Sequence, residues 1–127
     1  MRVTSITPIL YVEAIEPCVD FWTERLGFEK TVEVPEGDHA GFVILQKDSL
    51  QVMYQTRASV QADVPALGGT PMGGTILFIE VDDIDAVEKA LEGVEVAVPR
   101  RKTFYGADEL FVREPAGNLV GFAQFNR

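Results

Sequence analysis

Most of this chain alternates apolar and polar residues as β-strands do, and two stretches carry helical spacing instead. Residues 6–12 are apolar and rich in strand-forming residues. Residues 17–27 follow with Pro at the start, apolar positions four residues apart and a closing Gly, which together predict a helix. Three more strands are then expected, at residues 28–34, 41–46 and 50–55. The first half is therefore predicted to have the order βαβββ.

The second half of the chain repeats this order. Residues 75–81 predict a strand, and residues 82–93 predict a helix with Asp82 or Asp83 as N-cap and Gly93 as terminator. The last three expected strands are residues 94–99, 107–114 and 118–125. Two such repeats normally pair, because neither module buries its sheet alone.

The segment between the repeats, residues 56–74, is rich in Gly, Pro and small polar residues. Such composition is typical of a linker, here with room for a short helical turn at residues 60–67. We therefore predict a single domain over residues 1–127. Its first module spans about residues 3–55 and its second about residues 75–127.

The composition indicates a soluble globular protein, since 46% of the 127 residues are hydrophobic and 24% are charged. No apolar run approaches the roughly 20 residues that span a membrane. The net charge of −9 opposes binding to nucleic acid and to anionic lipid surfaces. The start of the chain lacks the pattern of a secretory signal, and one Cys forms no internal disulfide, so a cytoplasmic location is expected.

The chain holds one His, His39, and one Cys, Cys18. These two residues are too few for a zinc site of the Cys/His type, so only a carboxylate-rich metal site remains open. We interpret His39 as part of a polar turn and Cys18 as a buried apolar residue of the first helix. No nucleophile elbow surrounds either residue, and a nucleophilic triad is not expected.

Three segments, residues 8–30, 76–91 and 111–125, resemble the vicinal oxygen chelate superfamily, which includes glyoxalases, ring-cleaving dioxygenases and bleomycin resistance proteins. The resemblance covers nearly the whole chain. It implies an α+β fold in which two tandem βαβββ modules form a rolled, concave mixed sheet with the helices on the convex face. The Phe21-Trp22 pair and residues 26–30 look most like bleomycin resistance proteins, and Trp22 is expected to anchor the core.

Metal-dependent members of this superfamily take their ligands from the first and last strands of each module. By resemblance, the corresponding positions in this chain are Thr7, Gln51, Ile76 and Gly121. None of them is a carboxylate or an imidazole, and one hydroxyl with one amide is a poor donor set for a divalent ion. We therefore expect neither a metal nor another cofactor.

The strand residues that share a face with these positions form a mostly apolar pocket. From alternation and resemblance together, we expect ligand contacts from Tyr11, Gln51, Phe78, Glu80, Arg101, Tyr105, Glu109 and Phe111. Aromatic rings would stack on a flat ligand, the carboxylates would neutralise a cation, and Arg101 would bind an anionic group. The alternative is that Glu80 and Glu109 are solvated at strand ends and that residues 99–102 form a solvated basic turn.

These observations favour a metal-free binding protein, similar to bleomycin resistance proteins, that sequesters a small organic ligand in the cleft of a homodimer. A cationic, antibiotic-like compound is one candidate ligand, and the dimer is implied by the resemblance. The alternative is an enzyme of the superfamily, a lyase, isomerase or dioxygenase-like protein, with a non-standard or metal-independent site. Such an enzyme would use Glu80 or Glu109 as base and Tyr105 as donor. A third possibility is a module that serves oligomerisation or partner recognition without a small ligand.

Overall fold

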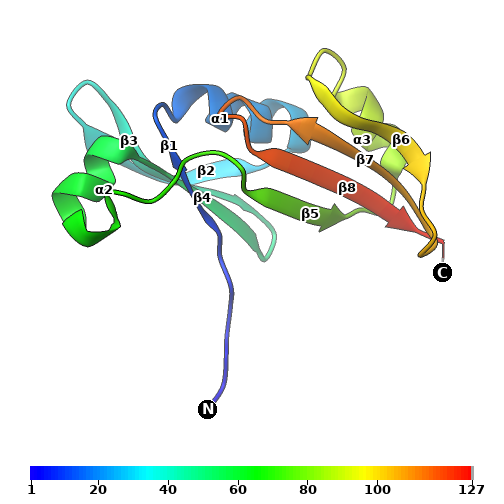
Figure 1. Cartoon of the computed structure of the whole chain (residues 1–127), viewed down its shortest axis with the longest axis horizontal. Coiled ribbons are helices and arrows are strands. Elements are labelled where there is room, and N and C mark those ends of the chain that lie inside the picture. The colour runs from blue at the N-terminus through cyan, green and yellow to red at the C-terminus, as the bar shows by residue number, and fades with distance from the viewer. Residues whose placement is uncertain (127) are drawn as a thin grey trace. The chain divides into compact units, whose positions relative to one another are not determined.

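The predicted repeat is present as two four-stranded sheets, each with its own helix (Figure 1). The structure is a computed structural model and describes residues 1–126. The chain forms two compact units: unit 1 is Met1–Gly73, and unit 2 begins at Gly74. Each unit contains one βαβββ module, which confirms the α+β fold expected from the sequence.

The sheet of unit 1 has the strand order β1-β4-β3-β2. Strands β1 and β4 are parallel, with Ile9 opposite Met53 and Tyr11 opposite Gln55, and the other pairs are antiparallel. Strand β1 begins at Ile9, three residues later than predicted, so Thr7 precedes the strand. The four strands are β1 (Ile9–Val12), β2 (Glu29–Glu36), β3 (His39–Lys47) and β4 (Leu50–Thr56).

His39 is the first residue of β3 and pairs with Glu36, which corrects its assignment to a turn. The turn itself consists of the two residues before it. Gly37 has a φ of 66°, a left-handed conformation that glycine adopts without strain. The polar residues around His39 therefore belong to a tight hairpin. Its second strand, β3, begins at the polar residue His39, one residue before the apolar Ala40.

The helix of unit 1 consists of α1 (Glu16–Asp20) and the π-helical turn Phe21–Arg25 that continues it. The turn is capped by Leu26, and Gly27 follows with a φ of 73°, which allows the chain to reverse. Trp22 is buried, and its indole N–H donates to the Tyr54 hydroxyl at 2.9 Å. Trp22 thus anchors the helix on the sheet, as predicted.

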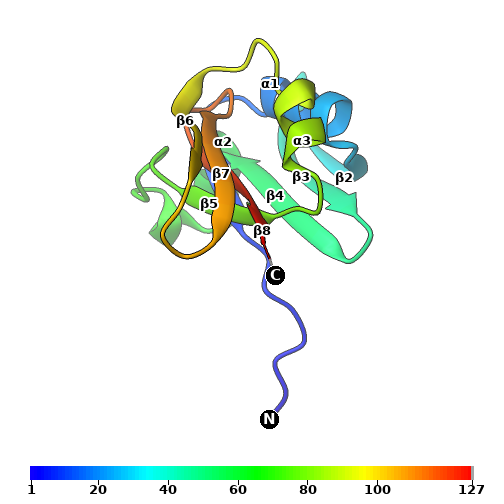
Figure 2. The ribbon, with the colours of Figure 1, turned by 90° about the vertical axis from the view of Figure 1, so that its right-hand side faces the viewer.

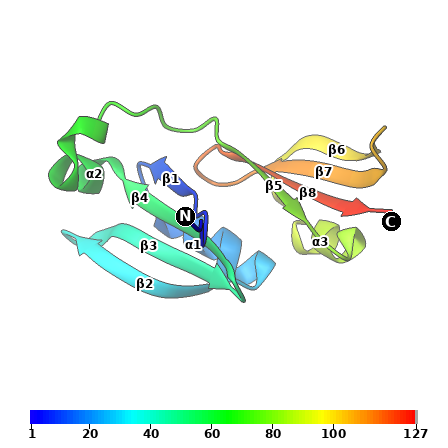
Figure 3. The same ribbon diagram turned by 90° about the horizontal axis from the view of Figure 1, so that it is seen from below.

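The segment after β4 holds more helix than its composition suggests. Helix α2 (Arg57–Asp63) follows the strand directly, and a 3-10 turn, Pro65–Leu67, comes next (Figure 3). Thr56 caps α2, because its side-chain oxygen accepts from the Ser59 N–H at 3.2 Å. The predicted linker is therefore partly helical and begins with a helix N-cap.

The sheet of unit 2 has the equivalent order β5-β8-β7-β6, with β5 and β8 parallel. Its elements are β5 (Ile76–Glu80), α3 (Ile84–Ala90), β6 (Val96–Lys102), β7 (Ala107–Arg113) and β8 (Leu119–Phe125). Asp83 caps α3 by accepting from the Ala86 N–H at 3.1 Å, which settles the choice between the two predicted aspartates. The helix and strand patterns of the sequence thus predict most of the secondary structure of unit 2.

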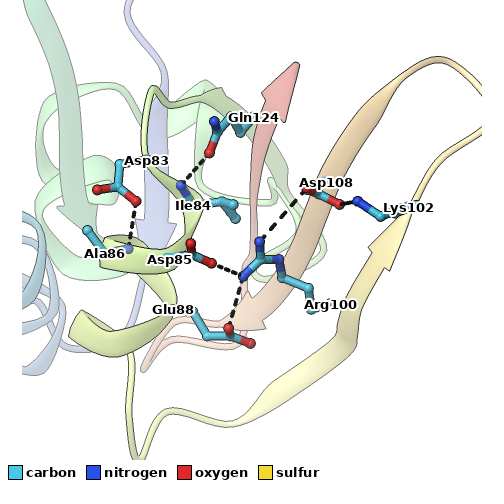
Figure 4. Close-up of polar contacts among 9 residues, drawn as sticks. All are labelled: Asp83, Ile84, Asp85, Ala86, Glu88, Arg100, Lys102, Asp108 and Gln124. Atoms are coloured by element: carbon cyan, nitrogen blue, oxygen red, sulfur yellow. Dashed lines mark hydrogen bonds and ion pairs between the residues drawn. The ribbon is translucent and has the colours of Figure 1, made fainter. Parts of the chain in front are cut away.

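Helix α3 lies along one face of this sheet (Figures 2 and 3). Ile84 is buried there, and its backbone N–H donates to the Gln124 side chain at 2.9 Å. Arg100 on β6 contacts Asp85 at 2.6 Å and Glu88 at 3.1 Å, and its hydrogen bond to Asp85 raises the pKa of the guanidinium (Figure 4). Residues 99–102 therefore belong to strand β6 and do not form the solvated basic turn considered above.

The β7–β8 turn is organised by Glu114, a buried carboxylate. One of its oxygens accepts from the N–H groups of Ala116 at 2.7 Å and Asn118 at 2.8 Å. Gly117 has a φ of 91°, whereas Asn118 stays at negative φ. This turn places Leu119 in register with Ile76 of β5 and so fixes the parallel pair.

Within residues 1–126, no helix has the length and apolar character needed to cross a membrane.

Candidate functional site

The face of the unit 2 sheet opposite α3 carries a group of aromatic side chains. Cross-strand partners share a face, and Gly121 lies opposite both Phe78 on β5 and Phe111 on β7. Phe125 follows on the same side of β8. Residues of the other parity, such as Val120 and Phe122, are buried. We call this surface the aromatic face; its members are Ile76, Phe78, Glu80, Arg101, Tyr105, Glu109, Phe111, Gly121, Ala123 and Phe125.

The rings on the aromatic face form a continuous chain of contacts. Phe78 lies 6.4 Å from Phe111 and 6.3 Å from Phe125, measured between ring centroids. Tyr105 lies 6.0 Å from Phe125. Phe78 remains 50% exposed and Tyr105 41% exposed, although large aromatic side chains are usually well buried. The chain therefore presents an apolar aromatic surface on which a flat ring has room to stack.

The Phe111 ring packs directly against the backbone of Gly121. A Cβ atom added at this position would lie 2.3 Å from the Phe111 ring, well inside van der Waals contact. Only glycine lets the ring lie this close to β8. The position that the resemblance equates with a metal-binding carboxylate is thus covered by an aromatic ring.

A row of polar positions crosses the same face. Glu80 on β5 pairs with Ala123 on β8, Ala123 pairs with Glu109 on β7, and Glu109 pairs with Arg101 on β6. Partners in a row share a face. The row therefore carries the Glu80 carboxylate on β5, the Glu109 carboxylate on β7 and the Arg101 guanidinium on the edge strand β6. The row brings three of the predicted site residues onto one line.

Glu109 is the buried charged residue of this row, with 1% of its surface exposed. One carboxylate oxygen accepts the hydroxyl of Tyr105. The other oxygen contacts Arg101 through Nε at 3.0 Å and Nη2 at 2.7 Å. Both oxygens are therefore engaged, and Glu109 does not present the free carboxylate that a cationic ligand would need.

The hydrogen bond from Tyr105 to Glu109 raises the pKa of the Tyr105 phenol above its ordinary value of 10.0. The neutral phenol is favoured because it donates to a carboxylate, whereas the phenolate would face a like charge. Tyr105 is therefore protonated at neutral pH. In this arrangement its oxygen still offers lone pairs to a donor on a ligand.

Glu80 is exposed at the β5 edge of the row. It lines an open depression together with Val81, Asp82, Gln124 and Phe125. This edge of the aromatic face is therefore acidic, in contrast to the β6 edge.

Two predicted site residues, Tyr11 and Gln51, lie in unit 1. The Tyr11 hydroxyl donates to the Gly68 carbonyl at 3.0 Å, and the Arg57 guanidinium lies 5.9 Å from the centre of its ring. The Gln51 amide contacts the Gln46 side chain at 3.5 Å. These side chains contact other parts of unit 1, whereas the remaining six predicted residues lie on the aromatic face of unit 2.

Sequence reasoning left two aromatic residues out of the expected ligand contacts. Phe125 joins Phe78 to Tyr105, and its parity with Gly121 and Ala123 on β8 was the available signal. Phe104 lies beside Tyr105 with ring centroids 5.2 Å apart and is fully exposed. It lies in the β6–β7 connection, where strand alternation does not indicate which side of the sheet a side chain faces.

The four positions equated with metal ligands do not fit a metal ion. In the sheet, Ile76 pairs with Leu119 and Gly121 pairs with Phe78, so Ile76 and Gly121 lie on one face without pairing directly. An isoleucine and a glycine supply no side-chain donor, and Phe111 covers the glycine. Within residues 1–126, no group of three or more His, Cys, Asp or Glu side chains is arranged to hold a metal ion.

Comparison with known proteins gives one family and many similar folds. The family model of the Glyoxalase/Bleomycin resistance protein/Dioxygenase superfamily matches residues 2–122. A search of curated proteins gives no match.

Three solved structures illustrate the likeness of fold. A lactoylglutathione lyase from Agrobacterium tumefaciens has a TM-score of 0.77 and 17% identity, covering 98% of this chain and 96% of its own. A glyoxalase/bleomycin resistance protein/dioxygenase from Nocardioides has a TM-score of 0.73 and 19% identity, covering 98% and 85%. TnmS3, an antibiotic binding protein from Streptomyces sp. CB03234, has a TM-score of 0.69 and 21% identity, covering 99% and 100%. At these identities the likeness concerns the fold.

Proposed function

The chain belongs to the glyoxalase/bleomycin resistance protein/dioxygenase superfamily, and from this premise we propose that it is a metal-free binding protein that sequesters a small organic ligand containing a flat ring. The observation that carries the proposal is the exposed aromatic face of unit 2, where linked rings adjoin a fixed polar cluster. Apolar walls with a few convergent polar groups are typical of small-molecule sites. A solved structure of similar fold, TnmS3, is described as an antibiotic binding protein.

In this proposal the ligand ring stacks on Phe78 and Phe125, while Phe111 supports them from β7. Tyr105 and Arg101 face the polar part of the ligand, and Glu109 holds both in place. Glu80 borders the site at the β5 edge. We place Tyr11 and Gln51 outside this proposed site, because their polar groups contact other parts of unit 1.

We also propose that the protein is a homodimer. An exposed apolar residue on an edge strand supports it, since Ile76 on β5 is largely exposed. Light scattering at micromolar concentration should give the mass of two chains. A monodisperse monomer would contradict the dimer and leave the aromatic face to be tested on its own.

An enzyme that uses Glu109 as a base has less support. Glu109 already accepts contacts on both oxygens, and the Tyr105 hydroxyl already donates to Glu109. A general base needs a free acceptor within reach of the ligand proton. Binding without chemistry therefore accounts better for this cluster.

The proposal is tested by titrating the protein with 2-naphthoate and following its NMR spectrum. A ligand of about 13 non-hydrogen atoms that gains ~0.3 kcal/mol per atom would bind with a dissociation constant of about 1 mM. The Phe78→Ala variant should weaken binding about tenfold, because it removes the exposed ring at the centre of the face.

Ile9→Ala in unit 1 is the matched control. Ile9 lies three residues before Val12, as Phe78 lies three residues before Val81, and the two are 56% and 50% exposed. This control should change the dissociation constant less than twofold. Equal losses in both variants would overturn the assignment of the site to unit 2.

A further inference from the structure

We infer that the ligand of the aromatic face carries an anionic oxygen group, a carboxylate or a phenolate, beside its ring, and that Arg101 is the residue that recognises it. The inference rests on the proposed function, because it states what chemistry the same face accepts. It departs from the cationic, antibiotic-like compound that was one candidate ligand from the sequence.

The geometry of Arg101 is the first reason. Two of its nitrogens, Nε and Nη2, contact the same oxygen of Glu109, at 3.0 and 2.7 Å. The third nitrogen, Nη1, has no partner among residues 1–126, and the side chain is 53% exposed. A guanidinium carries five N–H donors in a plane, so the donors of Nη1 remain available to an oxygen acceptor.

The burial of Glu109 is the second reason. The carboxylate has only 1% of its surface exposed, whereas the guanidinium it pairs with is half exposed. A ligand on this face therefore meets the positive member of the pair. Because the buried carboxylate holds the guanidinium in one orientation, less side-chain entropy is lost when an anion binds. Glu109 acts here as a positioning residue.

The acidic β5 edge of the row determines how the ligand is oriented on the face. Glu80 lies three strands away from Arg101 in the same row, which corresponds to about 14 Å at a strand spacing of ~4.8 Å. Its carboxylate and that of Asp82 repel an anion from the β5 edge. The anionic group is thus directed to the β6 edge while the ring lies over Phe78 and Phe125.

The neighbouring Arg100 provides an internal control. Successive strand residues face opposite sides of a sheet, and Arg100 accordingly pairs with Asp85 and Glu88 of α3 on the other face. Both arginines contribute the same charge to the chain. Only Arg101 lies on the aromatic face, so a difference between their variants reports a local contact and not the net charge.

Three probes of the same shape test the inference by NMR titration at pH 7: 2-naphthoate, 2-naphthalenemethanol and 2-naphthylmethylammonium. The anion should bind about tenfold more tightly than the neutral alcohol, and the cation should bind most weakly. Arg101→Gln should remove the preference for the anion while the alcohol still binds as before. Arg100→Gln should retain the preference, and Glu109→Gln should reduce it by loosening the guanidinium.

The outcomes separate the two proposals. Equal binding of all three probes, or a preference that persists in Arg101→Gln, would overturn the inference and leave the aromatic binding site intact. Tightest binding of the cation, abolished by Glu80→Gln, would also overturn it and would place recognition at the β5 edge. Binding of none of the probes to the wild-type protein would overturn both the inference and the proposed function.

Discussion

Unit 1 and unit 2 carry the same strand arrangement, yet the face that each sheet turns away from its helix holds different side chains. In unit 1, polar groups on that face contact the unit's own chain: Tyr11 donates to the Gly68 carbonyl, and the Gln55 amide contacts Ser59 at 3.0 Å. In unit 2, the equivalent face has exposed rings and a half-exposed guanidinium. The same fold thus uses one face to hold the connecting segment, whereas the other face keeps exposed aromatic and basic side chains.

The contacts of unit 1 come from the segment that follows its last strand. Strand β4 continues into α2, which supplies Ser59, and the turn Pro65–Leu67 leads to Gly68. On the aromatic face of unit 2, Phe78 and Tyr105 stay 50% and 41% exposed. The difference between the two faces therefore lies in side-chain type and in the contacts that the connecting segment makes within unit 1.

The largest effect on stability is expected at Gly121, which pairs with Phe78 as Met53 pairs with Ile9 in unit 1. Gly121→Ala should lower the free energy of unfolding by about 1–3 kcal/mol, because the new Cβ displaces the Phe111 ring. Urea denaturation measures this loss. The double variant Gly121→Ala/Phe111→Leu should be more stable than the sum of the two single changes predicts. A loss below about 0.5 kcal/mol in Gly121→Ala would mean that the ring does not need this glycine.

A smaller effect is expected at Tyr11, whose hydroxyl ties the connecting segment to β1. Tyr11→Phe removes one partly buried hydrogen bond, worth about 1 kcal/mol. Amide hydrogen exchange should become faster in residues 57–70 and stay unchanged in β7 and β8. The affinity for 2-naphthoate should stay within twofold of the wild type. A tenfold weaker affinity of Tyr11→Phe for 2-naphthoate would mean that Tyr11 contacts the ligand. The proposed difference in function between the two faces would then be wrong.

The smallest effect is expected from ionisation of Tyr105. Its pKa is raised in the folded protein, so the stability contributed by its hydrogen bond is fully present below about pH 10. That contribution is lost as the pH rises through the raised pKa. The difference in phenolate absorbance between the wild type and Tyr105→Phe should show a midpoint above 10.0, and Glu109→Gln should lower it. A midpoint at or below 10.0 in the wild type would contradict the contact with Glu109.

Much of the fold could be predicted from the sequence, because alternation and helix signals are local properties. The repeated order βαβββ, the burial of Trp22 and the cap at Asp83 all rest on such patterns. Helix α2 was underestimated because the Gly and Pro residues that follow it dominate the composition of the segment. Only Val60 of this helix is buried, so the sequence of α2 lacks the periodic apolar positions that predict a helix.

The site could be predicted only in part, since alternation gives the face of a residue but not its neighbours on other strands. Phe78 was placed on the ligand face by alternation, whereas Glu109 and Phe111 were assigned to the site by the resemblance. The burial of Glu109 depends on the register of β6 with β7, which shifts between Val98 and Arg101. Such irregularities have no clear signature in a single sequence. The role of Glu109 as a holder of Arg101 and Tyr105 therefore required the structure.

The central claim is that the ligand binds the aromatic face of unit 2. The most direct test is to map amide chemical shifts of the wild-type protein during a titration with 2-naphthoate. Binding to the aromatic face should concentrate the changes in β5, β7, β8 and residues 101–109, with little change in β1, β4 and residues 57–70. Changes concentrated in β1, β4 and residues 57–70 would contradict it.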